Sequence, residues 1–171
     1  MSEEITAPIA APRWLSPDEL SAWMTLTAVL IKLPAVLDVQ LQRDAGLSHF
    51  EYLVLAGLSD APGRMLPMSR LAEFANGSLS RLSHVVKRLE SRGWIRRKPS
   101  AEDGRITVAE LTDEGFAKLV VTAPGHVEAA RQYVIDVLTP EQIDQLREIG
   151  EVILTKVDPA SNCPTAQKAG H

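Results

Sequence analysis

The segment from Ser78 to Arg92 combines short hydrogen-bonding side chains with basic ones. Its apolar residues recur at spacings of three and four, which predicts an α-helix with one buried side. The remaining positions carry hydrogen-bond donors, and serine is short enough to let a helix lie deep in the major groove of duplex DNA. The candidate DNA-binding residues of this helix are Ser78, Ser80, Arg81, Ser83, His84, Lys87 and Arg88.

Two short segments after this helix, 94–98 and 106–111, are rich in residues that favour strands, and an Asp-Gly turn lies between them. This pattern predicts a β-hairpin. A hairpin lying over DNA phosphates would use basic residues to set its register, and Arg105 could enter the minor groove. Asp103 is either paired with Arg105 or part of an ordinary turn. The candidate DNA-binding residues of the hairpin are Arg97, Lys98, Asp103 and Arg105.

The charge of the chain is unevenly distributed. Residues 64–105 contain ten basic and four acidic residues, a net charge of +6 within a chain whose total is −4. The rest of the chain is therefore strongly acidic. A basic middle in an acidic protein is the electrostatic footprint that a nucleic-acid backbone would select, although a solvated charged surface gives the same composition.

The elements that position these residues follow from capping signals and apolar spacing. We expect a helix from Ser16 to about Asp44, kinked at Pro34, then helices at 48–60, 68–75 and 78–93. After the hairpin, a helix should run from Thr112 to about residue 137 with a bend at 124–125, and another should begin at Thr139. The fold class is mainly α with a small β-hairpin.

Helix–turn–helix followed by a hairpin is the outline of a winged helix. We expect a winged helix-turn-helix DNA-binding domain at 47–111 and dimerisation helices at 14–46 and 112–158, because the apolar stripes of these outer helices need a partner surface. A flexible N-terminal arm at 1–13 and a disordered tail at 159–171 complete the organisation.

The run from Leu71 to Arg97, with Arg-Leu-Glu at 88–90 and Gly93, resembles the multiple antibiotic resistance regulator (MarR) family, as do Asp103-Gly104-Arg105 and the Leu-Thr-x-x-Gly at 111–115. The resemblance covers about residues 14–157. It implies a homodimeric transcriptional regulator, a repressor that binds a pseudopalindromic DNA operator with the fourth helix in the major groove and the wing arginine in the minor groove. His84 stands where many members carry arginine, so we expect an altered base preference.

The resemblance also implies a small-molecule effector, a phenolic or other aromatic acid, bound between the dimer helices and the DNA-binding domain. The candidate ligand-binding residues are Trp23, His49, Tyr52 and His126, although each also has a structural interpretation as a core or surface residue.

Other function classes find less support in the sequence. The single cysteine, Cys163, lies in the predicted tail, which disfavours a thiol sensor. The four histidines have no clustered metal-ligand spacing, and no catalytic or phosphate-binding motif is present. We expect no enzyme activity, cofactor, metal or membrane partner, and a cytoplasmic protein. A protein–protein adaptor that has lost DNA binding is a further alternative, but it predicts a weaker basic set.

Overall fold

A computed structural model describes residues 12–158, which fall into two compact units that divide between Val36 and Leu37. We describe each unit by itself. Helix α1 (Pro17–Ala45) crosses this boundary and remains helical through Pro34. The Ser16 hydroxyl accepts a hydrogen bond from the Glu19 N–H at 3.3 Å, and the Glu19 carboxylate accepts one from the Ser16 N–H at 2.7 Å, so the expected capping box starts α1.

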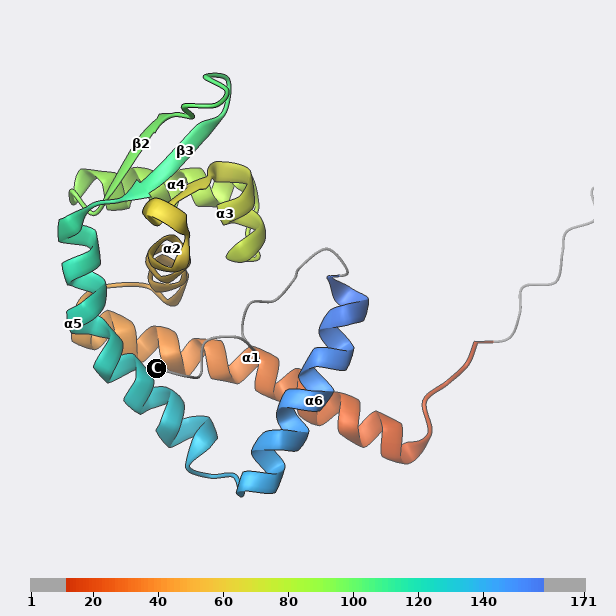
Figure 1. The fold of residues 1–171 in the computed structure, drawn as a ribbon. Helices are drawn as coiled ribbons and strands as arrows, with labels where there is room; N and C mark the ends of the chain where they lie inside the picture. Colours follow the sequence, from red (N-terminus) through yellow and green to blue (C-terminus); the bar gives the residue numbers. More distant parts are fainter. Residues whose placement is uncertain (1–11, 159–171) are drawn as a thin grey trace, which may run out of the picture. The chain divides into compact units, whose positions relative to one another are not determined.

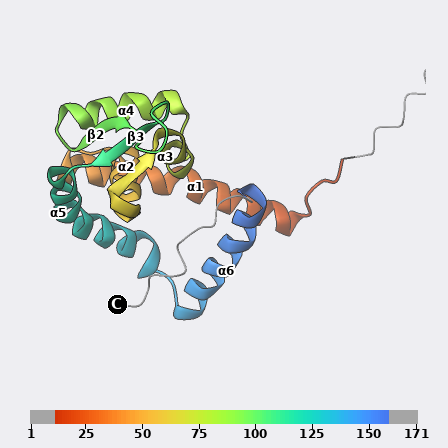
Figure 2. The same cartoon turned by 45° about the horizontal axis from the view of Figure 1, so that its top comes forward.

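The second unit contains the predicted helix-turn-helix and hairpin. In chain order its elements are α2 (His49–Asp60), a 3₁₀ turn η1 (Pro62–Arg64), β1 (Met65–Pro67), α3 (Met68–Phe74), α4 (Leu79–Ser91), β2 (Ile95–Pro99) and β3 (Thr107–Leu111). Helices α3 and α4 lie at one end of this lobe beside strands β2 and β3 (Figure 2). The fold class expected from the sequence is confirmed, and the bounds of α2, α3, α4, β2 and β3 differ from the predicted ones by two residues or fewer.

The sheet is antiparallel, with strand order β1-β3-β2. Ile95 pairs with Leu111 and Pro99 with Thr107, which fixes the register of the hairpin. We call residues 95–111 the wing; it projects beyond α4 (Figure 1). Strand β1, which pairs Met65 with Glu110, was not expected from the sequence. It is only three residues long and lacks an alternating pattern.

The core of the lobe is made by leucines from the three helices that surround the sheet. Leu55, Leu58, Leu71, Leu82 and Leu89 are completely buried. Three of the four apolar positions used to predict α4 face this core without measurable exposure, and Val85 is nearly buried. The spacing of apolar residues therefore located the inner side of α4 correctly.

A close backbone approach joins the wing to helix α5 (Asp113–Ala130). A β-carbon at Gly115 would collide with the carbonyl oxygen of Trp94, so only glycine fits at this position. Thr112 caps α5 by accepting from the Gly115 N–H, and its hydroxyl donates to the Gly93 carbonyl at 2.7 Å. The Leu-Thr-x-x-Gly motif thus fixes where α5 leaves the sheet.

The C-terminal helices differ in part from expectation. Helix α5 continues through Pro124 and is followed by a π-helical turn, η2 (Arg131–Ile135), so the helix predicted to reach residue 137 changes geometry at 131. Helix α6 (Pro140–Val157) begins with the expected capping box of Thr139 and Gln142. The predicted arm at 1–13 and tail at 159–171 lie almost entirely outside the described residues.

Apolar side chains are exposed on the terminal helices. Helix α6 has no buried residue, and Ile149 and Val152 are 58% and 70% exposed. In the first unit, Trp23, Leu30 and Ile31 of α1 are also exposed. By length and composition α1 could also cross a membrane, but this is weak evidence because the same test is passed by helices that become covered by protein.

Candidate nucleic-acid interface

Helix α4 presents different side chains in four directions. Its inner face contains Leu82, Val85, Val86 and Leu89. On the opposite face Ser80, His84, Lys87 and Ser91 recur at helical spacing, and all four are exposed. We call these four residues the outward stripe. No ion pair or aromatic contact within residues 12–158 involves Ser80, His84 or Lys87, so these side chains are available to a ligand.

The predicted residue Ser78 lies at the end of the helix rather than on this stripe. It is the N-cap of α4, and its hydroxyl accepts a hydrogen bond from the Arg81 N–H at 3.1 Å. Ser83 is half-buried on the edge of α4 that faces the wing. Both remain predicted DNA contacts, and their geometry differs from that of Ser80 and His84.

The other edge of α4 contacts the start of α2. The Arg81 guanidinium lies 4.3 Å from the centre of the Phe50 ring, a cation–π geometry. A cation in the first turn of a helix is disfavoured by the helix dipole, and stacking on Phe50 gives Arg81 a favourable contact within the chain. Arg81 therefore has a structural contact as well as a predicted DNA contact.

A buried carboxylate ties the two helices together. The Glu51 side chain, only 3% exposed, accepts a hydrogen bond from the Arg88 Nε at 2.7 Å and another from the Ser48 N–H at 2.7 Å. Burial would raise the pKa of Glu51, but the bonds from Ser48 and Arg88 outweigh it and the pKa lies below its usual value. The capping box was visible in the sequence; the contact with Arg88, 37 residues away, was not.

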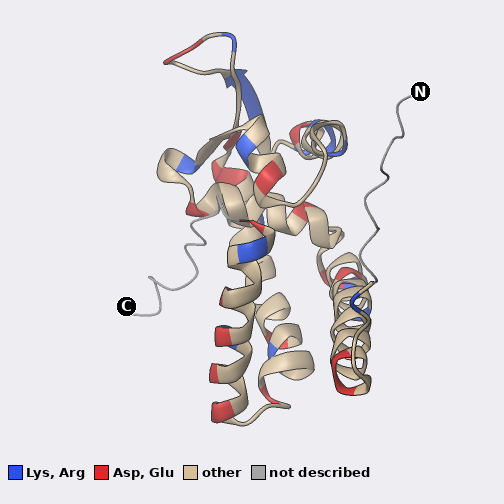
Figure 3. Ribbon diagram, turned by 90° about the vertical axis from the view of Figure 1, so that its right-hand side faces the viewer, with Lys and Arg blue, Asp and Glu red and all other residues tan. Residues whose placement is uncertain are grey.

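Each basic residue of the wing is paired with a carboxylate, and strand β2, which contains three of them, is visible in Figure 3. Arg97 donates to Glu90 of α4 at 2.7 Å, and Arg96 and Lys98 both contact Glu110 at 2.7 and 3.1 Å. These partners lower the pKa of Glu90 and of Glu110. The bond to Glu90 joins the root of the wing to α4.

The tip of the wing contains Asp103 and Arg105, the two residues considered as a pair in the sequence. Arg105 Nε lies 3.1 Å from Asp103, and the Arg105 N–H donates to the same carboxylate at 3.0 Å. The arginine side chain is 92% exposed, and its hydrogen bonds lower the pKa of Asp103. Of the two interpretations left open by the sequence, the paired one describes this structure.

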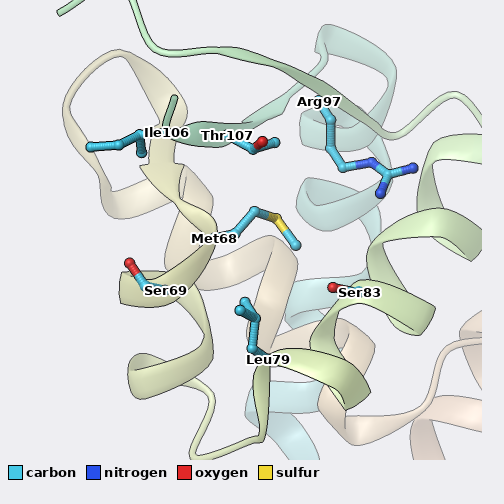
Figure 4. Close-up of a pocket in the computed structure, with 7 residues that line it drawn as sticks. All are labelled: Met68, Ser69, Leu79, Ser83, Arg97, Ile106 and Thr107. Atoms are coloured by element: carbon cyan, nitrogen blue, oxygen red, sulfur yellow. The ribbon is translucent and has the colours of Figure 1, made fainter. Parts of the chain in front are cut away.

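A groove of about 350 Å³ lies between α3, α4 and the root of the wing (Figure 4). Met68 and Ser69 line it from α3, and Leu79 and Ser83 from α4. Arg97, Ile106 and Thr107 line it from the hairpin. Sequence analysis missed Leu79 as a surface residue because an isolated leucine at the start of a helix resembles a core position.

Three of the four predicted ligand-binding residues come together elsewhere in the same unit. The ring centre of His126, on α5, lies 4.2 Å from that of Tyr52 and 5.8 Å from that of His49, both on α2. Burial lowers the pKa of both histidines and raises that of Tyr52. Trp23 belongs to the first unit, so its position relative to this cluster is not described.

Two buried polar atoms beside this cluster have no hydrogen-bond partner among the described residues: His126 Nδ1 and Gln40 Oε1. The amide nitrogen of Gln40 donates to Asp44 at 2.9 Å, and it is the atom nearest to where a β-carbon on Gly125 would lie. Gln40 and His126 are therefore close neighbours. Within residues 12–158, no group of three or more histidine, cysteine, aspartate or glutamate side chains could hold a metal ion.

Comparison with known proteins identifies this arrangement. The MarR family model matches residues 47–107, the helix-turn-helix and most of the wing. The regulator PecS of Dickeya dadantii is 35% identical over 118 residues, which cover 68% of each chain. Sco3205 of Streptomyces coelicolor, a MarR family regulator solved in complex with DNA, is 45% identical with a TM-score of 0.82, over 89% of this chain and 95% of Sco3205.

The chain belongs to the MarR family. A second regulator of Streptomyces coelicolor, AbsC, is 35% identical with a TM-score of 0.79 over 85% of this chain and 98% of its own. As a MarR-family protein, the chain is a DNA-binding transcriptional regulator with a winged helix-turn-helix, and its relatives are regulators rather than enzymes. The family expected from the sequence motifs is confirmed.

Proposed function

We propose that this MarR-family regulator is a cytoplasmic repressor that binds a pseudopalindromic operator as a homodimer and releases it when a small aromatic acid binds. The observation that carries the proposal is the outward stripe of α4 beside a projecting wing with an exposed arginine at its tip. Serine, histidine and lysine on an exposed helix face provide donors for base edges and phosphates.

In the proposed complex α4 lies in the major groove and the wing reaches the adjacent minor groove. Ser80 and His84 face the base edges, and Lys87 faces a phosphate. Asp103 holds the exposed Arg105 guanidinium at the wing tip, which reduces the side-chain entropy lost when Arg105 binds in a narrow groove. The remaining predicted contacts, Ser78, Arg81, Ser83, Arg88, Arg97 and Lys98, lie around this surface.

The homodimer is proposed from the exposed apolar side chains of the terminal helices. Ile149 and Val152 of α6, and Trp23 and Ile31 of α1, would meet water in an isolated chain. Exposed apolar side chains of this kind mark an interaction site, and a second copy is the simplest partner for a protein that binds a two-fold symmetric site. This role also accounts for the apolar character of α1 without a membrane.

The effector is assigned to the cluster of His49, Tyr52 and His126. The hydroxyl group of a phenolic acid could donate a hydrogen bond to the unpartnered Gln40 Oε1 while its ring packs against the aromatic side chains. Trp23 stays a predicted contributor from α1.

A physical route leads from this cluster to the DNA-reading helix. His49 is followed directly by Phe50 and Glu51, which contact Arg81 and Arg88 of α4. Arg92 also donates to the Gly46 carbonyl at 3.1 Å. A ligand that displaces the start of α2 would therefore move the helix that reads DNA.

Fluorescence anisotropy with the upstream intergenic duplex of its own gene, beside a scrambled duplex and at several salt concentrations, tests the proposal. We expect tight binding that prefers the native duplex, and release when salicylate, the first of a panel of hydroxybenzoic acids, is added. Sedimentation velocity on the same sample should give a dimer.

A matched pair of variants separates DNA binding from the response to the aromatic acid. Lys87→Ala should weaken binding to all duplexes, whereas Gln40→Ala should keep DNA binding and reduce the response to the acid. Equal weak binding to both duplexes would contradict a repressor of the neighbouring gene, and a monomer at micromolar concentration would contradict the dimer.

A further inference from the structure

The groove between α3, α4 and the root of the wing has an apolar wall that the proposed DNA contacts leave unused. Leu79, the first residue of α4, is 54% exposed, and Ile106, across the groove, is 44% exposed. In Figure 4 the Leu79 side chain points into the space between Met68 and Ser83. Single exposed apolar residues are ordinary, but two that line one groove beside a predicted DNA-binding helix offer an apolar contact to a ligand.

The polar side chains of this groove are mostly uncharged. Ser69, Ser83 and Thr107 contribute hydroxyl groups, and the Arg97 guanidinium is held by Glu90. A strongly charged ligand would find few unpaired groups of opposite charge in this groove. The occupant should therefore present an apolar group with neutral polar atoms around it.

The position of the groove indicates which apolar group the occupant presents. Leu79 is the first residue of α4, and it lines the groove together with Ser83, a predicted DNA contact on the edge of α4 that faces the wing. In helix-turn-helix proteins the N-terminal residues of the recognition helix contact base edges. The C5-methyl of thymine is the apolar group that base pairs display in the major groove. Leu79 is thus placed to contact a base at the margin of the region read by Ser80 and His84.

We propose that Leu79 is a specificity-determining residue that recognises the C5-methyl group of a thymine in each half-site. The inference rests on the DNA orientation proposed above. Transfer of one methyl group from water to an apolar contact corresponds to about a fourfold change in affinity. Leu79 therefore favours thymine over cytosine, which lacks the methyl group.

Replacing thymine by uracil removes only this methyl and tests the proposal directly. A duplex selected from a random pool by the full-length protein would be scanned with single dT-to-dU replacements, and affinities measured by anisotropy. For the wild type we expect one position in each half-site at which the replacement weakens binding about fourfold. Leu79→Ala should bind the dT duplex more weakly and no longer distinguish dT from dU there.

Two further variants keep the result interpretable. Leu79→Met preserves an apolar side chain and should retain the preference for dT. Lys87→Ala should weaken binding to the dT and dU duplexes equally, because a phosphate contact does not depend on the base methyl.

The opposite results overturn the inference. If no position is sensitive to dU, or if Leu79→Ala keeps the full preference for dT, Leu79 does not read a methyl group. Loss of the salicylate response in Leu79→Ala with unchanged dT preference would assign the groove to the effector instead. Failure of the protein to select any duplex would count against the proposed operator binding, and so is distinguishable from these outcomes.

Discussion

The winged helix-turn-helix lobe, residues 47–111, and helix α6 use apolar residues in opposite ways. In the lobe, leucines of α2, α3 and α4 are completely buried, whereas α6 leaves Leu146, Ile149 and Val152 half or more exposed and buries no residue. The lobe buries most of its apolar side chains within one chain, and Phe74, Leu79 and Ile106 are its large exposed ones. Helix α6 has the same kind of side chains without a covering partner among residues 12–158, so its stable packing depends on something outside this part of the chain.

Two substitutions by alanine should show the difference between the lobe and α6 most clearly. Leu89→Ala removes a fully buried side chain and should lower the free energy of unfolding by about 2–5 kcal/mol at every protein concentration. Ile149→Ala alters an exposed residue and should cost less than about 0.5 kcal/mol in dilute samples.

Urea denaturation at two widely separated protein concentrations measures both effects. At high concentration, where the proposed dimer forms, the cost of Ile149→Ala should increase because the residue becomes covered. An equal cost for the two variants at both concentrations would contradict the distinction between the lobe and α6.

A smaller effect is expected from the buried carboxylate between α2 and α4. Glu51→Gln keeps the shape of the side chain but removes the charge that pairs with Arg88, and should lower the free energy of unfolding by about 1–3 kcal/mol. The half-exposed Arg88 can regain water, so the loss stays below that of a fully buried pair. Glu148→Gln, which changes an exposed carboxylate of α6, is the control.

The dependence on pH gives this prediction a second measurement. The pKa of Glu51 is lower in the folded protein than its ordinary value of 4.5, so its contribution is complete above that pH and is lost as the pH falls through the lowered pKa. Urea midpoints of Glu51→Gln should therefore fall less steeply in acid than those of the wild type. If the urea midpoints of both proteins fall equally steeply in acid, Glu51 is not responsible for the loss of stability at low pH.

The smallest expected effect concerns His49 and His126, which connect α2 to α5. Burial lowers the pKa of both below the ordinary value of 6.5, so the unfolded chain binds protons more readily than the folded one. Their contribution to stability is complete above that pH and declines as the pH falls below it. His126→Gln should flatten the change in urea midpoint between about pH 7 and pH 5. If the urea midpoint of His126→Gln changes with pH as steeply as that of the wild type, His126 does not cause this dependence.

The success of sequence analysis differed between local and distant features. The limits of α2 and α4 were predicted closely because Ser48, Ser78 and Gly93 signal helix ends within a few residues. The inner side of α4 followed from its apolar spacing. Strand β1 was missed because a three-residue strand contains too little pattern.

The arrangement of the site was only partly predictable. The pairing of Asp103 with Arg105 is local and was one of two interpretations considered. The contacts of Arg88 with Glu51 and of Arg81 with Phe50 join residues more than thirty positions apart, and a single sequence contains no signal for such pairs. The meeting of His49, Tyr52 and His126 likewise depends on how α5 packs on α2.

The paired cations of the wing have a thermodynamic consequence for association with DNA. Arg96, Arg97, Lys98 and Arg105 already have carboxylate partners, so approach to a phosphate exchanges one anionic neighbour for another. Such an exchange releases fewer condensed counterions than the arrival of a free cation, each of which adds about 0.9 to the logarithmic salt slope. We therefore expect the ten basic residues of segment 64–105 to overstate how steeply affinity declines with ionic strength.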